Sequence, residues 1–179
     1  MDFRDIKSLP RSSYKVDIAW SWGIDCEIGG LIGQIDEYLA QGLNMDPDFQ
    51  RGYVWTMQQK IDFVEWGLIG GSSGMAIYFN HPGWMNSWDG DFVLVDWKQR
   101  IDAVLGFLNN VRAFGLLFKD FSGRMDPLTA RFAFHICDLR TKREVLEWYI
   151  MMNTGGTQHR PEEIEKVKML IKNENSRSL

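Results

Sequence analysis

Residues 93–100, which read VLVDWKQR, decide how the rest of the sequence is interpreted. Three apolar residues end at an acid, a pattern that predicts a buried strand ending near Asp96. The residues that follow, 101–108, have apolar side chains at helical spacing. A strand therefore runs into a helix through a charged corner, and such connections often carry functional side chains on a rigid scaffold.

Helix and strand patterns are mixed along the remaining sequence. Thr56 with Gln59 three residues later is a capping-box signature for the start of a helix. Helices are predicted at residues 31–42, 56–71, 101–108 and 142–152 and from 161 onward. Strands are predicted at residues 16–20, 75–79, 92–95, 112–118 and 131–136, with a short one within 43–55. Because strands and helices do not alternate strictly, the fold class predicted is α+β.

Composition favours one domain over residues 1–179, because 45% of the residues are apolar and can form a core. Residues 1–15 and 173–179 are expected to be frayed tails. The net charge of −4 argues against a protein that coats DNA electrostatically. The N-terminal residues lack the apolar segment of a signal peptide, and no apolar run approaches membrane-spanning length. Cys26 and Cys137 lie far apart, which is typical of a reduced, cytoplasmic protein with buried thiols.

Three polar corners stand where predicted elements begin or end. They are residues 46–52 (DPDFQRG), 96–100 (DWKQR) and 153–157 (NTGGT). Loops held by a scaffold are where binding sites tend to be built. The three corners are therefore candidates for one shared site.

The second corner has the clearest chemistry. Arg100 is predicted in the first turn of a helix, where backbone N–H groups lack partners and a cation is unfavourable unless an anion joins it. A phosphate there would be held by N–H groups and by the guanidinium together. Asp96 would orient Arg100 or hold Mg²⁺. In the alternative interpretation, Asp96 caps the helix and pairs with Lys98 or Arg100 at the surface.

The other two corners are weaker signals when taken alone. Arg51 follows Gln50, an amide donor and acceptor, but a single arginine in such a loop is usually part of a surface ion pair. The glycines Gly155 and Gly156 would let residues 153–157 present N–H groups to an anion. The same glycines would equally serve a helix C-cap followed by a turn.

Taken in order, the three corners are more specific. PDFQRGYVW, then VDWKQR, then EVLEWYIMMNTGGTQHRPEEI resembles the ParB/sulfiredoxin-like N-terminal domain of GmrSD-type, modification-dependent (type IV) restriction endonucleases, over roughly residues 31–165. The resemblance implies a ParB/sulfiredoxin-like fold, with a small mixed sheet flanked by helices. It also implies a nucleotide-handling domain that uses Mg²⁺ and a nucleoside triphosphate.

The family's motifs carry over to this sequence residue by residue. The first box falls on Pro47, Phe49, Gln50 and Arg51, the second on Asp96, Gln99 and Arg100, and the third on Met152, Asn153, Gly155, Gly156 and Thr157. Catalytic roles are implied for Asp96, Gln99, Arg100, Gln50 and Arg51, with Asp96 also as metal ligand. Nucleotide-binding roles are implied for Arg51, Trp97, Lys98, Arg100, Asn153, Gly155, Gly156 and Thr157.

Two positions of the second box depart from the family pattern. Trp97 replaces a glycine and Lys98 replaces a glutamine. If the family's glycine serves a positive φ, a tryptophan there is strained. Either the turn differs, or Trp97 has an ordinary φ and covers the pocket. Its ring then either stacks on a nucleotide base or fills the pocket and leaves a domain that binds without hydrolysis.

Two functions are therefore expected. The first is nucleotide binding with Mg²⁺-dependent NTP hydrolysis or phosphoryl transfer, linked to DNA modification or phage defence in the cytoplasm of a bacterial or phage-infected cell. The second is a binding module without turnover that senses modified DNA or a partner protein, with a loop containing Trp84 and Trp88 as contact surface. No His-Asn-His motif is present in the sequence, so the chain is not expected to act as a nuclease by itself, and a separate nuclease subunit is an expected partner. A ParB-like DNA-binding regulator is a third and weaker interpretation, because the chain is acidic.

Overall fold

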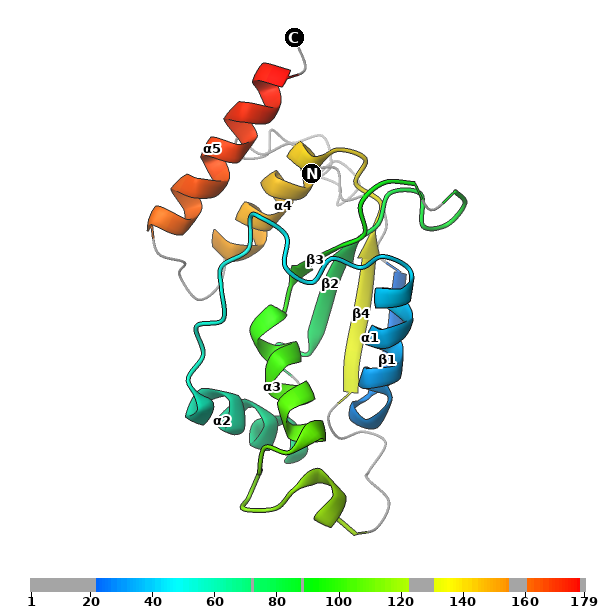
Figure 1. Cartoon of the computed structure of the whole chain (residues 1–179), viewed down its shortest axis with the longest axis vertical. Helices are drawn as coiled ribbons and strands as arrows, with labels where there is room; N and C mark the ends of the chain where they lie inside the picture. The colour runs from blue at the N-terminus through cyan, green and yellow to red at the C-terminus, as the bar shows by residue number, and fades with distance from the viewer. Residues whose placement is uncertain (1–21, 72, 88, 123–130, 155–160, 178–179) are drawn as a thin grey trace, which may run out of the picture. The chain divides into compact units, whose positions relative to one another are not determined.

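The computed structural model describes residues 22–71, 73–87, 89–122, 131–154 and 161–177 (Figure 1). The chain divides into two compact units, one of residues Ala19–Arg140 and one that holds the described residues from Thr141 onward. The larger unit contains the sheet and the first two polar corners. The described part of the smaller one forms two helices.

The sheet of the larger unit has four strands, in the order β1 (Trp22–Glu27), β4 (Arg131–Cys137), β2 (Ala76–Asn80) and β3 (Val93–Asp96). The two central strands, β4 and β2, are parallel, and each edge strand is antiparallel to its neighbour. A small mixed sheet with helices beside it confirms the predicted α+β class.

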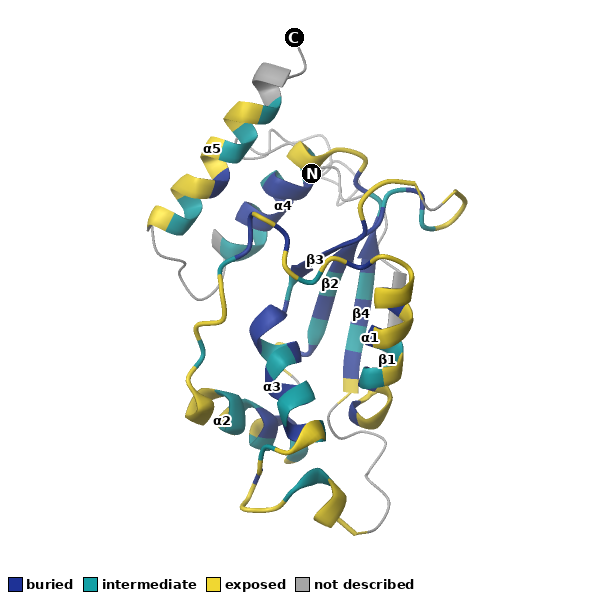
Figure 2. Cartoon of the chain, in the orientation of Figure 1, coloured by how far each residue is buried: buried dark blue, intermediate teal, exposed yellow. Residues whose placement is uncertain are grey.

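Helices α1 (Leu31–Ala40) and α3 (Lys98–Asn109) pack on one face of this sheet, and α2 (Met57–Leu68) packs against α3 (Figure 1). The ring of Tyr38 on α1 meets Phe79 and Phe134 edge-on, with centroids 5.4 and 6.0 Å apart. Buried and partly exposed residues alternate along β4, as Figure 2 shows. That alternation follows from the period of two in a strand with one face on the core.

Local sequence signals predicted several boundaries correctly. Thr56 accepts from the backbone N–H of Gln59, whose side chain accepts from the backbone N–H of Thr56, so the predicted capping box is confirmed. Gly70 follows α2 with φ +93°, a conformation that glycine adopts without steric cost. Helix α3 begins at Lys98, earlier than the predicted 101, so the charged corner is itself the first turn of the helix.

Two predicted strands are wrong. Within residues 43–55 there is only an isolated bridge between Asn44 and Val93. Instead of a strand at 112–118, residues 113–116 form a tight turn in which Ala113 and Leu116 exchange backbone hydrogen bonds of 2.9 Å, and a 3₁₀ helix begins at Phe118. Positive φ values at Phe114 and Gly115 reverse the chain there.

The predicted strand at 16–20 lies outside the described residues. Strand β1, from Trp22 onward, was not predicted, and it is followed by a 3₁₀ helix at Ile28–Gly30. Trp22, Ile24 and Cys26 alternate with Gly23, Asp25 and Glu27, so the period of two is present in the sequence, although Gly23 weakens a strand pattern.

The described residues of the smaller unit form α4 (Lys142–Thr154) and α5 (Pro161–Arg177), which pack against each other. Thr141 and Glu144 bond reciprocally at the start of α4. Helix α5 continues through Arg177, beyond residue 173 where a frayed tail was expected, while residues 1–15 lie outside the described part. Among the described residues, none of the helices is both long and apolar enough to span a membrane.

Candidate functional site

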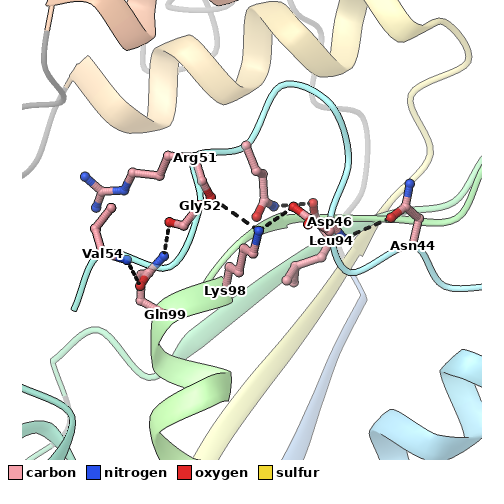
Figure 3. Close-up of polar contacts among 9 residues, drawn as sticks. Asn44, Asp46, Arg51, Gly52, Val54, Leu94, Lys98 and Gln99 are labelled. Atoms are coloured by element: carbon pink, nitrogen blue, oxygen red, sulfur yellow. Dashed lines mark hydrogen bonds and ion pairs between the residues drawn. The ribbon is translucent and has the colours of Figure 1, made fainter. Parts of the chain in front are cut away.

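The first two polar corners, which are separated by more than forty residues in the sequence, are in direct contact in the larger unit. Residues 46–55 lie along the end of β3 and the first turn of α3 (Figure 3). Asn44 begins this contact, because its backbone exchanges hydrogen bonds with Phe92 and Leu94 at 2.8 and 3.0 Å. The expected meeting of these two corners is therefore present in the structure.

Gln50 connects the first box to the strand. Its side chain is only 8% exposed, and Nε2 donates to the carbonyl of Leu94 at 2.5 Å. Burial without such a bond would leave a costly unsatisfied amide. The amide nitrogen of Gln50 is thus engaged in holding the box against β3.

Gln99 connects the second box to the segment before α2. Its Oε1 accepts from the backbone N–H groups of Val54 at 2.9 Å and Trp55 at 3.2 Å, and its Nε2 donates to the carbonyl of Gly52 at 2.8 Å. The side chain is 7% exposed. Both ends of this amide bind backbone, so Gln99 acts as a clamp on residues 52–55 (Figure 3).

Lys98 is the buried cation of the corner, with 5% of its surface exposed. Its Nζ forms an ion pair with the carboxylate of Asp46 and donates to the carbonyl of Arg51 at 3.3 Å. The same Nζ lies 4.6 Å from the centre of the Tyr53 ring. The side chain of Asp46 is 72% exposed, so this carboxylate stands between the buried ammonium and the solvent.

Trp97 has the backbone conformation of a glycine. Its φ is +98° and its ψ is 6°, in the left-handed region. The side chain is 2% exposed, its ring packs edge-on against Phe63 and Phe132, and Nε1 donates to the carbonyl of Gly74 at 2.6 Å. An ordinary φ at Trp97, one of the two expected alternatives, is therefore not what the structure has. The ring belongs to the core and offers no open face to a nucleotide base.

Asp96 and Arg100 do not face Lys98. Oδ1 of Asp96 accepts from the backbone N–H of Trp97 at 2.7 Å. Nη1 of Arg100 donates to the carbonyl of Gly74 at 3.1 Å. Residues two apart in a helix are separated by about 200° around its axis, so Lys98 and Arg100 point to different sides. The expected surface pairing of Asp96 with Lys98 is also absent, since the ion-pair partner of Lys98 is Asp46.

Asp96 was predicted to bind Mg²⁺, so the side chains that could be metal ligands were compared with its position. In the part of the chain that the structure describes, no three His, Cys, Asp or Glu side chains gather as metal ligands would. One oxygen of Asp96 is already engaged with a backbone N–H. The role of Asp96 as a Mg²⁺ ligand therefore stays a prediction.

Arg51 and the third corner contribute less to this geometry. The carbonyl of Arg51 faces Nζ of Lys98, while its guanidinium extends away from it (Figure 3). Asn153 belongs to the smaller unit and donates from Nδ2 to the carbonyl of Tyr149 at 2.7 Å, in the last turn of α4. Gly155, Gly156 and Thr157 lie outside the described residues, so the role of residues 153–157 stays a prediction.

Asp46 and Tyr53 were missed as site residues. Asp46 belongs to the first corner, but the sequence motifs assign it no role. The signal that could have indicated one is Lys98, which stands where the family has glutamine and whose charge requires an acidic partner. Tyr53 follows the first box directly. Pattern alone gives neither residue a partner, because both contacts cross more than forty residues of sequence.

The structure also describes Trp84 and the two cysteines, which were singled out in the sequence. Trp84 is partly buried and packs against the core, and Trp88 lies outside the described residues. Both cysteines are free, but only Cys137 is fully buried, whereas Cys26 is partly exposed. Burial raises the pKa of the Cys137 thiol to about 12. A thiol with so high a pKa is a poor nucleophile at neutral pH.

Comparison of the chain with family models, curated proteins and solved structures found no match. The resemblance to the ParB/sulfiredoxin-like domains therefore rests on the three sequence boxes alone.

Proposed function

We propose that the larger unit binds the phosphates of a nucleotide at the corner formed by residues 46–55 and 96–99, without hydrolysing them. The observation that carries the proposal is that the two boxes form one corner around the buried ammonium of Lys98. A cation with so little exposed surface is a strong attractor for an anion, since little water competes for it. The sequence resemblance supports a nucleotide as that anion.

Binding at Lys98 requires a phosphate to take the place of Asp46. An ammonium has three N–H donors, and Lys98 directs them at the Asp46 carboxylate, the Arg51 carbonyl and the Tyr53 ring. Only Asp46 can leave easily, because most of its side chain is already in solvent. A triphosphate carries more negative charge than a carboxylate and would win this exchange.

Turnover is disfavoured by the same contacts. Phosphoryl transfer depends on side chains that position water and neutralise developing charge. The amides of Gln50 and Gln99 instead bind backbone groups, and Asp96 accepts from the backbone N–H of Trp97. Arg100 binds the carbonyl of Gly74, away from Lys98. These contacts favour the expected binding module over the expected hydrolase.

The proposal is tested by calorimetric titration of the full chain. Each of the four common nucleoside triphosphates is titrated in the presence of Mg²⁺. Wild type is expected to bind at least one of them with a Kd below 1 mM, about −4 kcal/mol. Lys98→Gln is expected to weaken that binding about tenfold. Lys60→Gln is the matched control, because Lys60 is a partly buried lysine that pairs with Asp102 between α2 and α3.

Phosphate release measured on the same samples separates binding from hydrolysis. No release above the protein-free rate is expected. Mg²⁺-dependent release that Arg100→Ala abolishes would instead support the hydrolase. Absence of binding by every triphosphate at millimolar concentration would refute the proposed function altogether.

A further inference from the structure

Tyr53 is the exposed aromatic residue of the candidate corner. Its ring lies 4.6 Å from Nζ of Lys98, yet 58% of the residue is exposed. One part of the ring therefore meets the buried cation and a large part meets solvent. Trp97, the aromatic residue expected to stack on a nucleotide, is instead 2% exposed and packed in the core.

The backbone around Tyr53 is held in place, although residues 51–56 belong to no helix or strand. Gln99 binds the carbonyl of Gly52 on one side and the N–H groups of Val54 and Trp55 on the other. Thr56 then starts α2 with its capping box. Because the backbone on both sides of Tyr53 is hydrogen-bonded, little conformational entropy of this segment is lost when a flat ligand stacks on the ring.

The surroundings of Tyr53 combine apolar surface with positive charge. Val54 and Met57 are 52% and 55% exposed, and Figure 2 shows the segment leading into α2 largely in the colour of exposed residues. Lys98 lies beneath the ring, and Arg51 precedes it by two residues. A ligand that fits both features has a flat aromatic part and an anionic part. A nucleotide has both, whereas inorganic polyphosphate has only the second.

We propose that the exposed face of Tyr53 stacks on the base of a nucleoside triphosphate whose phosphates are held at Lys98. This inference rests on the proposed function and names the residue that distinguishes a nucleotide from a bare polyphosphate. Stacking on an aromatic side chain is tolerant of base identity, because every base has a π-face. The corner is therefore expected to accept several bases with similar affinity.

The experiment compares ATP with inorganic triphosphate by calorimetry, for wild type, Tyr53→Phe and Tyr53→Leu. Tyr53→Leu is expected to weaken ATP binding about 5- to 150-fold, the range that corresponds to losing one stacked base. Its affinity for inorganic triphosphate is expected to change less than about twofold. Tyr53→Phe keeps the ring and is expected to bind ATP like wild type.

Phe114→Leu is the matched control, because Phe114 is an aromatic residue of the same unit that is 52% exposed. Circular dichroism checks that each variant is folded. If Tyr53→Leu weakens ATP and triphosphate equally, Tyr53 only supports Lys98 and the inference is overturned. If it weakens neither, while wild type binds ATP, the inference is also overturned but the proposed function stands. If wild type binds neither ligand, the proposed function itself has failed.

Discussion

The backbone strain at Trp97 can be tested by comparing the stability of Trp97→Gly with that of Trp97→Ala. Trp97 has φ +98°, where a side chain with a Cβ costs about 1–2 kcal/mol. At an ordinary φ inside a regular element, glycine is less favourable than alanine by about 0.5–1 kcal/mol. Because the strain is larger than this entropic cost, Trp97→Gly is expected to be more stable than Trp97→Ala, by about 1 kcal/mol.

Both variants are expected to be less stable than wild type. Removing a buried tryptophan side chain typically lowers the free energy of unfolding by about 3–5 kcal/mol. Trp97 is 2% exposed and touches Phe63 and Phe132, so Trp97→Ala should fall in this range. Trp97→Gly should lose about 2–4 kcal/mol. The carbonyl of Gly74 keeps a partner in both variants, because Arg100 also donates to it.

Urea denaturation followed by far-UV circular dichroism measures these differences in the free energy of unfolding. The unfolding transitions of Trp97→Gly and Trp97→Ala are compared with each other. Trp66 supplies the control pair, since it is a 47% exposed tryptophan within the α2 helix. At Trp66, alanine is expected to be more stable than glycine by about 1 kcal/mol, the ordinary helical order. If alanine is also the more stable residue at position 97, Trp97 is not held in the left-handed conformation and the reasoning is refuted.

Three further predictions concern single side chains. Asp46→Asn is expected to tighten ATP binding at least fivefold by calorimetry, about 1 kcal/mol, because phosphate no longer competes with a carboxylate for Lys98; weaker binding would mean that Asp46 helps to hold the ligand. Cys137, whose pKa burial raises to about 12, is expected to resist alkylation at pH 8 in the folded protein and to react in urea, as mass spectrometry of labelled peptides would show; equal labelling in both states would contradict its burial. Burial lowers the pKa of His81 below its ordinary value of about 6.5. As the pH falls, the unfolded chain is therefore protonated at His81 before the folded protein is. The stability that neutral His81 contributes above about pH 6.5 is then lost with falling pH. The free energy of unfolding of wild type should therefore decrease from pH 7 to pH 5 more than that of His81→Gln, and parallel pH profiles would count against this account.

The elements that the sequence predicted well are those with local causes. The capping box of Thr56 and Gln59 involves residues three apart, and the strand ending near Asp96 is an uninterrupted apolar run. Residues 112–118 have the apolar composition of a strand. Positive φ values at Phe114 and Gly115, which composition does not reveal, make them a turn instead. Local sequence pattern therefore predicts the positions of helices and strands better than the positions of turns that reverse the chain direction.

Sequence by itself determined the α+β class and identified the first two boxes as members of one corner. Tertiary structure decided what each side chain of that corner does. Gln50 and Gln99 are clamps on the backbone, Lys98 faces Asp46, Arg100 faces Gly74, and Trp97 is in the core. The reason is that the direction of a side chain depends on its angle around the helix and on partners more than forty residues away, and neither can be deduced from the order of the residues in a motif.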